Sequence, residues 1–125
     1  MSDFFLFTAA VLLIVTAFAH SVLGELKLIG PLLARREGVL ASDLARVVLR
    51  FAWHLTSVTW MILAMILVQL VREPAMARHW AAGGTGAVFT GAGLFDAVAS
   101  RGRHVGWPLL TAIGTAALLS LVHFR

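Results

Sequence analysis

The chain contains no cysteine, no tyrosine and no asparagine, and it carries little charge. Without cysteine it has no disulfide framework, no thiolate metal site and no thiol nucleophile. Only 13% of its 125 residues are charged and 60% are hydrophobic, which is too little polar material to cover a soluble domain of this length. These absences indicate an integral membrane protein.

The charge that remains is mostly basic, with arginine far more frequent than lysine and a net charge of +4. The basic residues lie between apolar segments, where they orient a membrane protein, so we expect no nucleic-acid partner. The preference for arginine, with abundant alanine, glycine and leucine, is typical of a GC-rich bacterial genome. The opening MSDFF has an acid and no basic region, so we expect a retained first helix rather than a signal peptide.

The predicted fold is all-α, a four-transmembrane-helix bundle that forms one integral membrane domain over residues 1–125. The segments expected to span are about 4–23, 47–71, 80–99 and 105–124. Each has about 20 residues, or ~30 Å of helix, which matches the hydrocarbon core of a bilayer. A transmembrane barrel is excluded because the segments lack a period of two.

The first connection, from about Gly24 to Leu49, is expected to be partly structured. Pro31 suits a first helical turn and Gly38 suits a helix end, which predicts a short interfacial helix over PLLARRE. Ser42 is expected to cap a second helix that begins near Asp43.

The distribution of basic residues predicts the orientation. Lys27, Arg35, Arg36, Arg46, Arg50, Arg101 and Arg103 fall on one side, and Arg72, Arg78 and Arg125 fall on the other. The positive-inside rule then puts the first and third connections in the cytoplasm and both termini in the periplasm of a bacterial inner membrane. The residues expected to contact lipid headgroups are Arg35, Arg36, Arg46, Trp53 and Trp107.

Ionisable side chains gather toward the cytoplasmic half in this arrangement. They are His20, Glu25, Arg50, His54, Asp96 and His104. Ionisable groups inside a membrane usually face other helices and find partners. We therefore hypothesise that His20 and His54 face each other, with Glu25 or Asp96 and Arg50 around them. Asp96 has two interpretations: a proton carrier, or an acid paired with a nearby arginine.

Several chemistries fit such a histidine pair. Two histidines from neighbouring helices can ligate haem b, and a histidine with an acid partner can bind a quinone and pass a proton. His54 with Met61 and Met65 offers soft ligands for Cu(I). Alternatively, the histidines are structural or bind headgroups. Because no CxxCH, HExxH or comparable spacing is present, we predict no metal site.

Small residues mark one face of the third apolar segment. The predicted helix-packing face consists of Gly83, Ala87 and Gly91, opposite Ala112 and Ala116 of the fourth segment, with Gly86, Thr90 and Gly93 running beside it. Small residues let helices approach closely in lipid. We expect this face to join the last two helices of one chain, with an oligomer or docking face as the alternative.

Two stretches resemble segments of small, functionally uncharacterised integral membrane proteins of proteobacteria. They are AHSVLGELKLIGPLL (19–33) and RFAWHLTSVTW (50–60), which lie in the first half of the chain. The resemblance implies a four-helix membrane fold and brings no activity. Small multidrug transporters have a similar size, but their embedded acid in the first helix is missing here. The asparagine motifs of fluoride channels are missing as well.

The leading functional hypothesis is a non-catalytic accessory or assembly subunit of a larger, energy-transducing membrane complex. It follows from the small size, the small-residue face and the lack of a recognisable catalytic motif. One alternative is a redox or proton-handling membrane protein with a quinone or haem b site near His20 and His54. Another is a proton-coupled transporter that acts as a homodimer and uses His54 or Asp96. The expected partners are the lipid bilayer and a membrane protein or a second copy.

Overall fold

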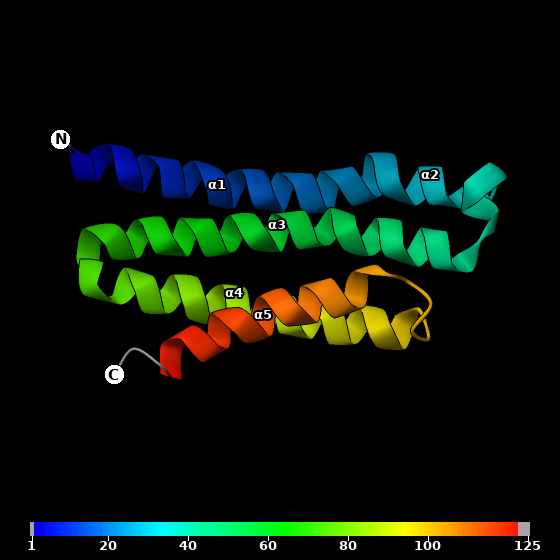
Figure 1. Ribbon diagram of the computed structural model, residues 1–125. Helices are drawn as coiled ribbons and strands as arrows, with labels where there is room; N and C mark the ends of the chain where they lie inside the picture. The colour runs from blue at the N-terminus through cyan, green and yellow to red at the C-terminus, as the bar shows by residue number, and fades with distance from the viewer. Residues whose placement is uncertain (1, 123–125) are drawn as a thin grey trace.

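The computed structural model describes residues 2–122, which are helical throughout apart from their connections and include no strand (Figure 1). Its four long helices are α1 (Ser2–Gly24), α3 (Asp43–Arg72), α4 (Pro74–Ala99) and α5 (Gly106–Val122). They correspond to the four apolar segments of the sequence. The last two residues of the fourth predicted segment lie outside the described residues.

The end of α1 at Gly24 agrees with the expected boundary, but the chain remains helical beyond it. A π-helical turn, Glu25–Ile29, leads directly into α2 (Gly30–Ala34), and Figure 1 shows α2 continuing the line of α1. The predicted short helix is therefore present, but it extends the first helix instead of forming a separate interfacial element. The polar residues around the end of α1 are compatible with a continuous helix because His20, Ser21 and Glu25 contact α3.

The connection between α2 and α3 is short and well defined. Arg36 and Gly38 have left-handed backbone angles, with φ values of 51° and 55°, which reverse the chain before a 3-10 turn, Gly38–Ala41. Ser42 then caps α3, because its hydroxyl oxygen accepts a hydrogen bond from the Ala45 amide. The predicted cap and the predicted start of this helix are confirmed.

The remaining two connections are also tight. Only Glu73 separates α3 from α4, and Pro74 occupies the first turn of α4, where its missing amide proton costs nothing. The α4–α5 connection turns at Gly102, which has a φ of 73° and donates its amide to the Ala97 carbonyl. These turns make successive helices antiparallel.

The helices form a row rather than a closed bundle. In the described part of the chain, α1 packs on α3, α3 packs on α4, and α4 packs on α5, whereas helices further apart in sequence make at most marginal contact. Figure 1 shows α1, α3 and α4 side by side, with α5 crossing α4. The prediction of four helices is therefore correct, and their expected closure into a bundle is not observed.

The interior is small and consists mainly of small side chains. Among the described residues, the buried hydrophobic positions are Ala10, Ala17, Ile29, Leu33, Ala64, Ala77 and Ala92. Large apolar side chains lie instead on the outside; Leu12, for example, is 60% exposed. Asp3–Ala34 and Asp43–Arg72 are long and apolar enough to cross a membrane, and only 11% of the most apolar stretch of each is buried.

The close packing of α4 on α5 differs from the prediction. Gly86, Gly93 and Gly114 are the positions at which an added Cβ would collide with the facing helix. In contrast, Gly91 faces open space, and Ala87, Ala112 and Ala116 are exposed. The contact therefore uses mainly the neighbouring stripe of α4. Of the expected face only Gly83 approaches α5, at Leu121, so the expected pairing of Ala87 and Gly91 with Ala112 and Ala116 needs correction. Two parallel stripes of small residues cannot be distinguished without knowing which one the partner helix faces.

Candidate functional site

The histidines of α1 and α3 lie on one interface, and each binds a serine of the opposite helix. The Nδ1 atom of His20 lies 3.0 Å from the Ser57 hydroxyl, and the Nδ1 atom of His54 lies 2.6 Å from the Ser21 hydroxyl. Ser57 is only 6% exposed. The two histidines thus share the interface but form reciprocal crosslinks between the helices instead of bonding to each other.

Glu25 and Arg50 extend the His54 pair. One carboxylate oxygen of Glu25 lies 3.3 Å from His54 Nε2, and the other lies 3.0 Å from an Arg50 guanidinium nitrogen. A carboxylate can only accept, so His54 donates through Nε2, and its Nδ1 accepts the Ser21 proton when the ring is neutral. We call this chain of Ser21, His54, Glu25 and Arg50 the polar seam. It joins the predicted residues Glu25, Arg50 and His54 in one hydrogen-bonded chain.

The ring of His20 is held by two tryptophans. It stacks on Trp53 with 4.1 Å between ring centroids and 11° between planes, and it meets Trp60 edge-on at 5.0 Å. The Trp53 indole also donates a 3.0 Å hydrogen bond to the His20 carbonyl. Trp53 therefore packs between helices, and its expected headgroup contact stays a prediction. Gly24 makes this possible, because an added Cβ would lie 2.5 Å from the Trp53 ring.

The order of Ser21, His54 and Glu25 resembles that of a hydrolytic triad, but two features argue against nucleophilic catalysis. The imidazole is reversed relative to the serine-protease arrangement, because Nδ1 faces the serine and Nε2 faces the acid. Ser21 also lies inside continuous helix α1, where backbone amides are committed to helical bonds and cannot form an oxyanion hole. The arrangement is better suited to fixing two helices or holding a proton.

Cofactor ligation finds little support in this geometry. Both ring nitrogens of His54 have hydrogen-bond partners, and one nitrogen of His20 does. At His54, iron or copper would have to displace those partners, whereas the Nε2 atom of His20 has no hydrogen bond to another described residue. Within residues 2–122, no cluster of three or more histidine, aspartate or glutamate side chains is arranged to hold a metal ion.

Asp96 and His104 form a separate pair and do not join the polar seam. The His104 Nδ1 atom donates a 2.6 Å hydrogen bond to an Asp96 carboxylate oxygen, and Asp96 is only 3% exposed. This pair ties the end of α4 to the loop before α5. Asp96 was expected to pair with Arg101 or Arg103 or to carry protons; its side-chain partner in the structure is His104.

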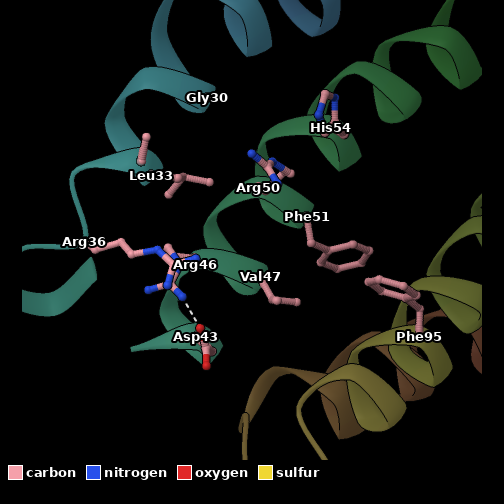
Figure 2. A pocket seen from close by; sticks show the side chains of 11 residues that line it. Gly30, Leu33, Arg36, Asp43, Arg46, Val47, Arg50, Phe51, His54 and Phe95 are labelled. Carbon is pink, nitrogen blue, oxygen red and sulfur yellow. Dashed lines mark hydrogen bonds and ion pairs between the residues drawn. The ribbon is translucent and has the colours of Figure 1, made fainter. Parts of the chain in front are cut away.

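A groove of about 780 Å³ opens beside the polar seam, between α2, α3 and the end of α4. Figure 2 shows His54 and Arg50 along one part of the groove and Arg36 and Arg46 along another part, near Asp43. Phe51 and Phe95 contribute an apolar wall and stack on each other at 5.0 Å between ring centroids. The groove therefore combines a cationic end with an aromatic wall.

The other residues expected to contact headgroups differ in their exposure and in their contacts with the rest of the protein. Arg46 is fixed by the protein itself, because it pairs with Asp43 and donates to the Leu40 and Ala41 carbonyls. Arg35 and Arg36 are exposed and have no ion pair or hydrogen bond from their side chains to other described residues. Trp107 is half-buried at the start of α5.

Roles for Ser21, Trp60 and Phe95 were not predicted from the sequence. For the α1–α3 interface the signal was available only through register. His20 lies fourteen residues before Ala34 and Ser57 lies fourteen residues after Asp43, so an antiparallel hairpin brings these two residues together, with Ser21 and Trp60 beside them. Placing the connection at residues 35–42 would have predicted the pair. The longer connection that we expected obscured it.

The chain was compared with known protein families, curated proteins and solved structures. No family model matches the chain, and neither a curated protein nor a solved structure matches it. The resemblance to small proteobacterial membrane proteins therefore stays a prediction.

Proposed function

We propose that this chain is a four-span protein of the bacterial inner membrane that serves as a non-catalytic subunit of a larger membrane complex. In this proposal the outer face of α4 receives a transmembrane helix of the partner protein. The polar seam then fixes α1 against α3 and performs no reaction. Each element of the proposal has separate support.

The membrane placement is supported by the distribution of apolar side chains. A soluble protein buries its long apolar helices, whereas the two longest apolar stretches here are only 11% buried. Large exposed side chains continue onto the other helices, including Leu94 of α4 and Leu109 of α5, which are 56% and 68% exposed. Hydrocarbon is the solvent that such a surface suits.

The orientation is supported by the turns. The connections near Arg36 and Arg101 lie at one end of the row, whereas the α3–α4 turn lies at the other (Figure 1). The first end carries more arginine, which favours the cytoplasm. Both termini are then periplasmic.

The observation that carries the subunit role is the open part of a small-residue stripe of α4. Gly83, Ala87 and Gly91 follow one another at intervals of four, but only Gly83 approaches α5, where a Cβ at this position would lie 3.9 Å from Leu121. Ala87 and Gly91 are exposed, and no atom lies within 4 Å of a Cβ built at Gly91. Stripes of this spacing let a second transmembrane helix approach closely, and an open row leaves this side of α4 accessible.

The decisive experiment is co-purification from native membranes in mild detergent, with Gly91→Leu as the test variant. We expect wild type to bring down a membrane-protein partner and Gly91→Leu to lose it, because leucine blocks close approach. Ala116→Leu is the matched control, since Ala116 is a small exposed residue on α5. It should retain the partner.

Three results would contradict the subunit role. One is wild-type protein that purifies alone at native expression; another is equal recovery of the partner with Gly91→Leu and wild type. Recovery of only a second copy of this chain would indicate a homo-oligomer, as in the transporter hypothesis, and would also overturn the proposal.

A second candidate function, proton or quinone handling, is favoured by one observation. The side chain of His54 is 38% exposed and lines the groove, with Glu25 behind it. A quinone carbonyl in the groove can accept a hydrogen bond from His54 Nε2 if it takes the place of Glu25. Its test is extraction of the purified protein for quinone, with an absorption spectrum to detect haem. A colourless, quinone-free preparation that is unchanged by His54→Ala would exclude this candidate.

A further inference from the structure

We infer that the groove between α2, α3 and α4 is a binding site for the headgroup of an anionic phospholipid. The inference rests on the membrane placement proposed above, but it does not require a partner complex. It assigns the groove a specific occupant, whereas the general expectation was loose contact of basic residues with the membrane surface.

Three arginines supply the cationic end. Arg36, Arg46 and Arg50 all line the groove, and Figure 2 shows Arg36 extending from the end of α2 toward Arg46. Arg46 is held in place by Asp43 and two backbone carbonyls, and its side chain is only 13% exposed. Arg36 has no ion pair or hydrogen bond from its side chain to another described residue. A rigid guanidinium beside an uncommitted one is suited to a phosphate, which accepts several charge-assisted hydrogen bonds.

The charge balance selects an anion. The three arginines are opposed by Asp43 and Glu25, which pair with Arg46 and Arg50. Among these arginines and carboxylates one positive charge remains without a partner, and Arg36 carries it. A phospholipid with one net negative charge compensates this excess, whereas a zwitterionic lipid brings none.

The apolar wall selects a lipid over a free anion. Val47 and Phe51 of α3 and Phe95 of α4 line the groove beyond the arginines. From Asp43 to His54 the groove follows eleven residues of α3, or ~16 Å, and Phe95 is still 52% exposed after stacking on Phe51. A headgroup at Arg36 would let the first part of an acyl chain lie along these side chains. A volume of about 780 Å³ suits such a fragment of a lipid.

The test is lipid binding by the isolated, delipidated full chain in detergent, measured by native mass spectrometry. The probes are phosphatidylglycerol, phosphatidylethanolamine with the same acyl chains, and glycerol phosphate as a competitor.

We expect selective retention of phosphatidylglycerol and about fivefold weaker binding by Arg36→Gln, as the loss of one arginine near a membrane surface implies. Arg35→Gln is the matched control. Arg35 is next to Arg36 in sequence, but its side chain is exposed and lies outside the groove. Binding by this variant should therefore stay within about twofold of wild type. Phe95→Ser should also weaken binding.

Three results would overturn the inference. Equal losses with Arg35→Gln and Arg36→Gln would indicate a diffuse basic surface. Glycerol phosphate that competes as well as the lipid would indicate a site for free anions. Equal retention of both lipids would remove the charge selectivity. Fractionation of the cells that produce the protein tests the proposed membrane placement separately. A chain absent from the membrane fraction would contradict the placement, whereas loss of lipid selectivity in a membrane-bound chain would contradict only the lipid site.

Discussion

At the scale of single residues, Gly24 has the most demanding role on the α1–α3 interface. The Trp53 ring occupies the space that a side chain at this position would need. That ring is held by its stack on His20 and by its hydrogen bond to the His20 carbonyl, so it cannot move aside without losing both. The glycine is required by packing, and the helix continues through it.

We predict that Gly24→Ala destabilises the isolated chain relative to Gly91→Ala. Both changes gain the same helix propensity, but only the first forces a Cβ into the Trp53 ring, whereas the second meets no atom within 4 Å. The two variants should differ by ~1–3 kcal/mol in free energy of unfolding. Thermal unfolding in one detergent, followed by tryptophan fluorescence, measures the difference. Equal stability would show that Trp53 is free to shift.

The sequence predicted the chemistry of this interface better than its geometry. His20, Glu25, Arg50 and His54 were recognised because ionisable groups in apolar helices need partners. Their actual partners were not predicted, because Ser21 is an ordinary polar residue until the register of the hairpin is known. Asp96 was assigned to the same set only from its expected depth in the membrane. Residues at one depth can lie in different places, and Asp96 pairs with His104 near the α4–α5 connection, away from the α1–α3 interface.

At the scale of elements, the π turn between α1 and α2 is the main departure from regular structure. Such turns often occur at functional sites, and this one begins at Glu25, which links His54 to Arg50. Gly30 closes the turn: its amide donates to the Glu25 carbonyl, and an added Cβ would lie 2.8 Å from that oxygen. Sequence periodicity predicts helices, but it does not reveal one extra residue in a turn.

We predict that Gly30→Ala opens the π turn and loosens the Glu25–Arg50 ion pair. Because alanine cannot approach the Glu25 carbonyl as closely, the amides of residues 25–34 should exchange with deuterium at least several-fold faster than in wild type. Hydrogen exchange with mass spectrometry measures this. Peptides from α5 provide the internal control and should be unchanged; unchanged exchange in both regions would contradict a special role for Gly30.

At the scale of the whole molecule, the lack of cysteine makes the orientation directly testable. Single cysteines can be introduced at Val39 and Val105, which are 80% and 83% exposed in the two connections predicted to be cytoplasmic, and at Glu73 in the opposite turn. A membrane-impermeant maleimide should label Glu73→Cys in cells with a permeabilised outer membrane. Val39→Cys and Val105→Cys should react only after the inner membrane is opened. The reverse pattern would invert the proposed topology.

The row of helices also bears on how the chain is built during synthesis. Each helix packs chiefly on the one made immediately before it, so no contact of consequence has to wait for the end of the chain. Helix α3 can dock on α1 as soon as it is complete, and α4 and α5 can follow in turn. Such mainly local contacts are typical of rapid folding, and they give the chain a natural order of assembly from its first hairpin to its last.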